Sequence, residues 1–206
     1  MSKPASLLHG QTYHIYARGT NRENIFIEQR NYAHFLNLYG QHVAPIADTY
    51  SYCLLKNHFH LLVRIKTHEE IAAQTRRVSE TLRVSVPAPS QAWSNFLNAY
   101  AKSINVAYQR TGSLFQHPFG RIVVDDERYF ARLVTYIHRN PQRHGLIEDF
   151  HDWPHSSYPT LMSRKPTHLR RDDTLAWFGD REWFAKAHLD VEDVIVLAPL
   201  IGDDFD

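Results

Sequence analysis

Two histidines separated by one residue, His58 and His60, stand in the apolar run NHFHLLV. Side chains alternate between the faces of a strand, so both imidazoles are expected on one face, roughly 6–7 Å apart along the chain. Two imidazoles at this spacing can share one metal ion, while Phe59 points into the opposite layer. A pair of polar positions on a solvated strand face is the alternative, because His-x-His alone is a weak motif.

A tyrosine and an asparagine four residues apart, Tyr136 and Asn140, lie in a segment with helical periodicity. Residues four apart share one face of a helix, so the phenol and the amide point the same way while Ile137 faces the core. The phenol is a potential nucleophile and the amide oxygen a potential metal ligand. A packing role for Tyr136 and a helix-terminal role for Asn140 are the alternatives.

The segment GSLFQHPFGR interleaves aromatic with polar and basic side chains, a pattern that suits stacking on unpaired bases. Its candidate DNA contacts are Phe115, Phe119 and Arg121, and the alternative is a strand with at least one phenylalanine in the core. Arg18 and Arg22 follow the first predicted strand and are candidate phosphate contacts. The alternative for these two arginines is a role as soluble turn residues.

The composition predicts a globular protein of one ordinary domain with an extension, since 43% of the 206 residues are hydrophobic and 13% aromatic. The single cysteine, Cys53, excludes an intramolecular disulfide and a cysteine zinc site, which favours a reducing compartment and a cytoplasmic location. We expect no membrane association, because no stretch approaches the roughly 18 apolar residues of a membrane span.

The charge is unevenly distributed along the chain. Residues 1–165 hold 19 Lys and Arg against 12 Asp and Glu, a balance of +7, whereas residues 166–206 hold 4 against 10, a balance of −6. A basic body suits a phosphate-bearing partner, because neutralised phosphates release counterions. A solvated surface of mixed charge is an equally good explanation of the charge alone.

Periodicity and turn residues predict the order strand–helix–hairpin–helix–strand–helix. The predicted elements are a strand at 11–20, a helix at 30–43, hairpin strands at 49–55 and 58–65, a short helix at 67–78, a loop at 84–91, a helix at 95–110, an extended segment at 113–124 and a helix from 125 that stops at Asn140-Pro141. This order indicates an α+β fold of ferredoxin-like character, an antiparallel sheet with helices on one face. Residues 1–150 form the predicted domain. Residues 151–206 form an extension that packs on or beside it through aromatic residues.

Five motifs, NHFHLLV, SNFLNAYAKSIN, GSLFQHPFGRI, YIHRNPQRHGL and WPHSSY, together resemble the single-tyrosine HUH transposases. The resemblance is to their REP-associated tyrosine transposase branch in particular, and it spans about Tyr13 to Tyr158. It implies that His58 and His60 are the metal-binding HUH pair. It also implies that Tyr136 is the nucleophile and Asn140 the third ligand, on the HUH endonuclease fold.

The activity that this resemblance implies is metal-dependent cleavage and transfer of single-stranded or hairpin DNA through a 5′-phosphotyrosine. The ligand types alone suit Mn²⁺ or Zn²⁺, whereas the family favours Mg²⁺ or Mn²⁺. The alternatives are a hairpin-binding regulator without cleavage, an HUH replication initiator or relaxase, and a hydrolase that uses water. A homodimer and a monomer are both open. His117, His138 and His144 are expected mostly at the surface or facing DNA.

Overall fold

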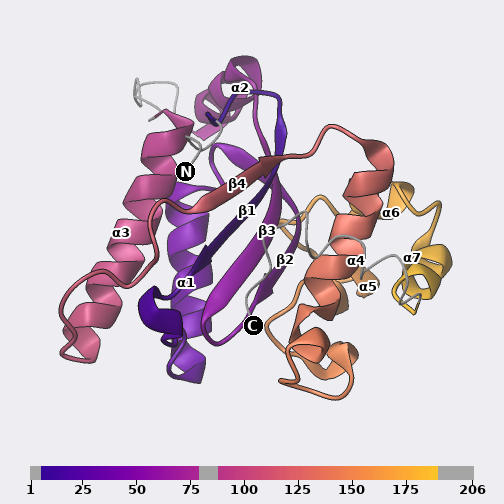
Figure 1. Cartoon of the computed structure of the whole chain (residues 1–206). Coiled ribbons are helices and arrows are strands. Elements are labelled where there is room, and N and C mark those ends of the chain that lie inside the picture. The colour runs from indigo at the N-terminus through magenta and orange to yellow at the C-terminus, as the bar shows by residue number, and fades with distance from the viewer. Residues whose placement is uncertain (1–5, 79–87, 190–206) are drawn as a thin grey trace.

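The computed structural model describes residues 6–78 and 88–189 of the chain (Figure 1). At its centre, four strands form an antiparallel sheet in the order β2-β3-β1-β4. The strands are β1 (Thr12–Arg18), β2 (Ala47–Leu54), β3 (His58–Ile65) and β4 (Gly120–Val123). The predicted antiparallel α+β class is therefore confirmed, and β2 and β3 form the predicted hairpin.

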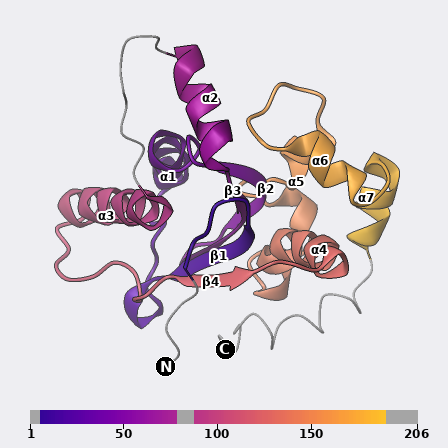
Figure 2. The same ribbon diagram turned by 90° about the horizontal axis from the view of Figure 1, so that it is seen from above.

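Helices cover both faces of this sheet, as the view from above in Figure 2 shows. α1 and α3 lie together on one face, and α4 lies on the other with the short helices that follow it. The elements are η1 (Thr20–Arg22), α1 (Gln29–His42), α2 (His68–Val78), α3 (Pro89–Ala107), α4 (Glu127–Arg143), η2 (Phe150–Asp152), α5 (Tyr158–Met162), α6 (Arg171–Ala176) and α7 (Arg181–Ala187).

The two helical layers differ from the expectation that helices lie on one face, and β3 gives the reason. Phe59 and Leu61 of this strand belong to the hydrophobic core that includes α1 and α3, whereas Leu62 belongs to a second core with α4. A strand with apolar residues on both faces cannot leave either face to water. A second helical layer is therefore needed, and it brings α4 onto the face that carries His58 and His60.

Helix α4 continues through Pro141 to Arg143, although the sequence predicts a stop at Asn140-Pro141. A proline removes one backbone donor from a helix. Here the following turn still closes, because the His144 amide donates to the Asn140 carbonyl at 3.0 Å and the Leu146 amide donates to the Pro141 carbonyl at 2.9 Å. Both Asn140 and Pro141 are buried, so packing offsets the lost hydrogen bond.

Three further element boundaries differ from the sequence expectation. α3 begins at Pro89 rather than at residue 95, with the proline in the first turn where its missing N–H costs nothing. The predicted loop at 84–91 lies partly outside the described residues, and its end belongs to this helix. Of the extended segment 113–124, only Gly120–Val123 pairs as a strand, while Phe115 forms an isolated bridge with Gly19.

The segment after α4 shares a hydrophobic core with that helix. Phe184 of α7 is fully buried there, the Trp153 indole donates to the Leu54 carbonyl at 3.0 Å, and the exposed Trp177 stacks on Phe130 with ring centroids 4.7 Å apart. A domain boundary at residue 150 stays a prediction. In the described part of the chain, no helix is long and apolar enough to cross a bilayer.

Candidate metal and nucleophile site

His58 and His60 share one face of β3, as their spacing predicts, and Phe59 is buried in the core on the opposite face. Their ring centroids lie 5.1 Å apart with the ring planes nearly perpendicular. Both residues are buried, with 4% of His58 and none of His60 exposed. The pair is therefore a buried polar couple between the sheet and α4, and the solvated strand face is excluded as its explanation.

Helix α4 places Tyr136 and Asn140 against this couple. The Tyr136 ring is fully buried, and its centroid lies 5.8 Å from that of His60, edge to face. Asn140, one turn later, donates its side-chain amide to the Tyr136 carbonyl at 3.2 Å, and its side chain also lies beside the His58 imidazole. β3 and α4, which lie far apart in the sequence, thus bring together all four candidate residues of the metal and nucleophile site.

The two imidazoles are each held through Nδ1. Nδ1 of His58 lies 2.7 Å from Oδ1 of Asn57, and Nδ1 of His60 lies 2.9 Å from Nε2 of His14. An amide oxygen only accepts, so His58 carries its hydrogen on Nδ1 and has a lone pair on Nε2. His60 has a lone pair on Nε2 in the tautomer that donates from Nδ1 to Nε2 of His14. This is the arrangement in which a second residue orients a metal-binding histidine.

Four buried polar atoms at this point have no hydrogen-bond partner among the described residues. They are Nε2 of His58, Nε2 of His60, Oδ1 of Asn140 and the hydroxyl of Tyr136. Buried polar atoms are almost always paired, because an unpaired one costs free energy. Two imidazole lone pairs and an amide oxygen are all electron-pair donors, so the cluster fits a cation better than any anionic ligand.

The protonation state of the histidines also suits a cation. Burial, together with the charges of His144 and Arg18, lowers the pKa of His58 to about 3. Burial also lowers the pKa of His60 well below its ordinary value, with neighbouring histidines adding to the effect. Both rings are therefore neutral at pH 7, which is the form that binds a metal.

A metal ion at this site has three protein ligands only if Asn140 is one of them. Across residues 6–78 and 88–189, no three His, Cys, Asp or Glu side chains are grouped to hold a metal ion. A cation here would thus use the amide oxygen of Asn140 in addition to His58 and His60. This donor set fits Mn²⁺ and Zn²⁺ by softness, and the choice of Mg²⁺ or Mn²⁺ stays a prediction from the resemblance.

His14 and Tyr16, which no sequence motif pointed to, lie on β1 directly beside the histidine couple. Tyr16 pairs with His60 across the sheet, and His14 with Leu62, so both side chains share the face of the histidine couple. The Tyr16 ring centroid lies 5.1 Å from that of His14. The alternation in QTYHIYARGT predicts that His14 and Tyr16 share one face of a strand. Only the register between β1 and β3 shows that this face is the one that carries His60.

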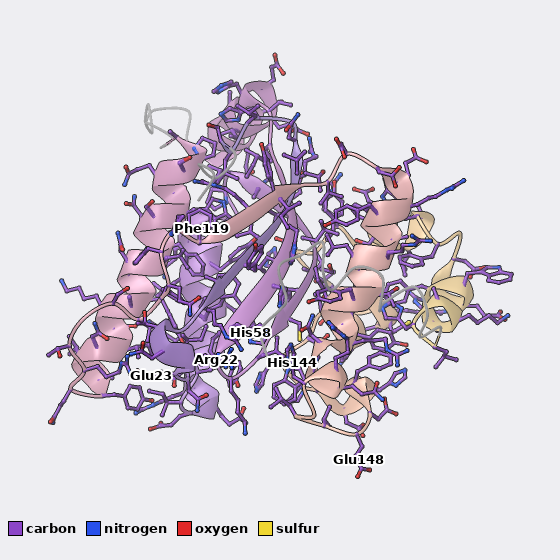
Figure 3. All side chains as sticks on the ribbon, in the orientation of Figure 1. Arg22, Glu23, His58, Phe119, His144 and Glu148 are labelled. Carbon is purple, nitrogen blue, oxygen red and sulfur yellow. The ribbon has the colours of Figure 1, made fainter. Side chains whose placement is uncertain are left out.

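Three basic or titratable side chains surround the site. Arg18 pairs with His58 across the sheet and is 7% exposed, and the exposed Arg143 lies over the Tyr136 ring at 4.9 Å from its centroid. His144, at the end of α4, has its ring centroid 5.0 Å from that of His58, and Figure 3 shows the two side chains between β3 and α4. Of these three, only Arg18 was predicted from the sequence to lie at the site.

The remaining candidate DNA contacts do not gather at this site. Phe115 is buried, at 3% exposed, in the core with α1 and α3, so its ring offers no face to a base. Phe119 packs half-buried against that same core, with the Arg121 guanidinium 4.8 Å from its ring centroid. Figure 3 shows Phe119 well away from His58, whereas the exposed Arg22 lies near it in η1. Of the five predicted contacts, only Arg18 and Arg22 lie near the histidine couple.

Comparison with known proteins finds relatives in sequence and in structure. No family model matches the chain. A Haemophilus influenzae protein named "Putative REP-associated tyrosine transposase" is 24% identical over 112 residues, which cover 54% of this chain and 58% of that protein. A solved structure of a REP-associated tyrosine transposase bound to a REP hairpin aligns with a TM-score of 0.59 at 15% identity, over 81% of this chain and 88% of that one. The resemblance that the motifs indicate is confirmed in sequence and in fold. The sequence match spans little more than half of the curated relative.

Proposed function

We propose that this chain cuts and rejoins single-stranded DNA beside a hairpin, with Tyr136 as the nucleophile and a divalent cation held by His58, His60 and Asn140. The observation that carries the proposal is a cluster of four buried polar atoms in these residues, none of which has a hydrogen-bond partner in the described part of the chain. The similar fold of a transposase bound to a hairpin supports the choice of DNA. A nucleophile on a helix over a sheet also presents no element that reads a duplex groove.

In the proposed reaction, the Tyr136 oxygen attacks a backbone phosphorus and the bond from that phosphorus to the 3′-oxygen breaks. The products are a 5′-phosphotyrosine and a DNA end with a free 3′-hydroxyl. The phenol loses one proton and the leaving oxygen gains one, so the step needs no nucleotide and no oxidant. A divalent cation held by His58, His60 and Asn140 would supply Lewis acidity to the phosphate and to the leaving oxygen.

The residues around the site supply what this step requires of the protein. The ordinary pKa of a tyrosine is about 10, so Tyr136 must be helped to lose its proton. The guanidinium of Arg143, 4.9 Å from the ring centroid, favours the phenolate. Arg18 and Arg22, at the end of β1 and in η1, are placed to contact the phosphates of a strand that approaches His58.

The test is covalent capture of a DNA pool. Protein and Mn²⁺ or Mg²⁺ are incubated with end-labelled single-stranded oligonucleotides that form stem-loops with varied stem, loop and flanking sequences, which removes the need to know the target. We expect a protein–DNA adduct that survives denaturation, and we expect none with Tyr136→Phe. Tyr158→Phe is the matched control, since it removes a tyrosine hydroxyl from the same hydrophobic core. An adduct with Tyr136→Phe, or none with the wild-type protein, overturns the proposal.

Hairpin binding without cleavage is the second candidate function, and the burial of Tyr136 favours it. The whole residue is 0% exposed, so DNA reaches its hydroxyl only if neighbouring side chains move. The same pool separates the two functions. A regulator would enrich particular hairpins with or without the Tyr136 hydroxyl and would form no adduct with either protein.

A further inference from the structure

A second buried polar cluster lies on the other side of α4 from the candidate nucleophile. His138 stands two residues after Tyr136 and two before Asn140, which turns its side chain roughly 200° around the helix from Tyr136. It is fully buried, which contradicts its expected place at the surface or on DNA. Its Nδ1 lies 2.7 Å from Nε2 of His188, and its Nε2 lies 2.7 Å from Oγ of Ser157.

The direction of these hydrogen bonds follows from one backbone carbonyl. Nδ1 of His188 lies 2.7 Å from the Phe184 carbonyl, which only accepts, so this nitrogen carries the hydrogen. Nε2 of His188 then accepts from Nδ1 of His138. Nε2 of His138 in turn accepts from the Ser157 hydroxyl at 2.7 Å, because the other acceptor for this proton, the Tyr52 carbonyl, is further away at 3.2 Å. The three side chains therefore form one continuous bridge in which each ring nitrogen is satisfied.

Each end of this bridge is fixed to a separate part of the fold. Oγ of Ser157 accepts from the Tyr52 amide at 2.8 Å, and the Ser157 amide donates to the Tyr52 carbonyl at 2.9 Å. Tyr52 belongs to β2, which pairs with the strand that carries His60. At the other end, Arg139 of α4 donates to the His188 carbonyl at 2.7 Å.

From this geometry we propose that His188 and Ser157 are positioning residues for the proposed strand cleavage. Apolar packing alone is non-directional and tolerates rotation of a helix, whereas hydrogen bonds to a ring fix its angle. Through His138 the bridge holds α4 in the rotation at which Tyr136 and Asn140 face the histidine couple on β3. The segment after residue 150 thereby does more than cover the sheet. The expected effect on strand cleavage rests on the proposed function, whereas the geometry of the bridge does not.

The experiment compares His188→Leu, which removes the acceptor for His138, with Phe184→Leu, which disturbs the same core and keeps the backbone carbonyl. Three quantities are measured below the unfolding temperature of both variants: amide NMR shifts, Mn²⁺ affinity and the rate of adduct formation at saturating hairpin. We expect His188→Leu to shift the amide signals of Tyr136 and Asn140. We also expect it to weaken Mn²⁺ binding and slow adduct formation at least tenfold, with hairpin affinity within about twofold of wild type.

Conservative variants keep the inference testable if His188→Leu does not fold. His188→Gln offers an amide oxygen to His138 and is expected to restore the Mn²⁺ affinity, and Ser157→Ala breaks the bridge from its other end. If His188→Leu loses stability like Phe184→Leu but keeps wild-type Mn²⁺ affinity and signals for Tyr136 and Asn140, the positioning role is wrong. If these signals and the affinity change while the wild-type protein forms no adduct, the bridge stands and the proposed function fails.

Discussion

Nδ1 of His60 lies 2.9 Å from Nε2 of His14, and both rings are completely buried. This contact orients the ring that would bind a metal, so we predict that His14→Leu lowers the affinity for Mn²⁺ by about 10- to 100-fold. Titration of Mn²⁺ followed by electron paramagnetic resonance measures the change. His34→Leu is the control, because it removes a histidine hydrogen bond to Ser103 on the opposite face of the sheet. Equal affinities in the two variants would show that His14 does not orient His60.

Arg143 lies over the Tyr136 ring on the exposed side of the site. The Arg143 guanidinium is exposed and lies 4.9 Å from the centroid of the Tyr136 ring, so water screens its attraction for a phenolate to about 1 kcal/mol, and Arg143→Gln should slow adduct formation roughly fivefold at pH 7. The rate should recover as the pH rises, because the phenol then loses its proton without the help of the Arg143 guanidinium. Arg143→Lys should lie between the two, and Arg128→Gln, an exposed position of α4, is the control. A defect that does not depend on pH would contradict this role.

Five histidines are buried in this fold, and their titration should make the metal-free protein sensitive to acid. They are His14, His58, His60, His138 and His188. Burial lowers the pKa of His14 and His58 from 6.5 to about 3 and that of His188 to about 4. Because the folded-state pKa lies below the unfolded one, their stability contribution is complete above pH 6.5. It is lost as the pH falls towards 3–4, where the unfolded chain alone takes up protons.

At pH 5.5, one unit below the unfolded pKa, each such histidine costs about 1.4 kcal/mol, so the five together remove several kcal/mol of the free energy of unfolding. Urea unfolding in the presence of a chelator at pH 7.5, 6.5 and 5.5 measures this loss. His14→Gln should flatten the pH dependence, because it removes one buried imidazole with a lowered pKa. A protein as stable at pH 5.5 as at pH 7.5 would show that these rings are accessible to protons.

Local spacing was enough to predict the chemical groups of the site. His58 and His60 share a face because a strand alternates, and Tyr136 and Asn140 share a face because a helix repeats about every 3.6 residues. Neither rule says that the two pairs meet. The motif resemblance implied it, and the contact between the rings of Tyr136 and His60 is visible only once α4 is placed on the sheet.

The wrong predictions have a common physical cause, because the position of each of these residues is set by tertiary contacts. Phe115 and Arg121 follow a pattern that suits DNA, but the register of the sheet pairs Arg121 with the buried Ile15, so it lies on the face away from the histidine couple. His138 was expected to be exposed because its partners, Ser157 and His188, lie 19 and 50 residues further along the chain. Hydrogen bonds over such separations leave no mark in local periodicity.

Gly120 provides a last prediction, because its missing side chain makes room for Tyr16. A Cβ atom at this position would lie 2.1 Å from the Tyr16 ring, so Gly120→Ala must displace that ring. The ring packs beside His14 and His60, with centroids 5.1 and 6.1 Å away. We therefore expect Gly120→Ala to weaken Mn²⁺ binding several-fold while the four-residue strand β4 still forms.

A double-mutant cycle isolates this route from any direct effect on the strand. In a Tyr16→Ala background the space is already open, so adding Gly120→Ala should cause no further loss of Mn²⁺ affinity. Gly40→Ala on α1, where a Cβ would meet nothing within 4 Å, is the matched control for the glycine substitution. Equal losses with and without the Tyr16 ring would mean that Gly120 acts through β4 itself, and that the ring has no part in holding His60.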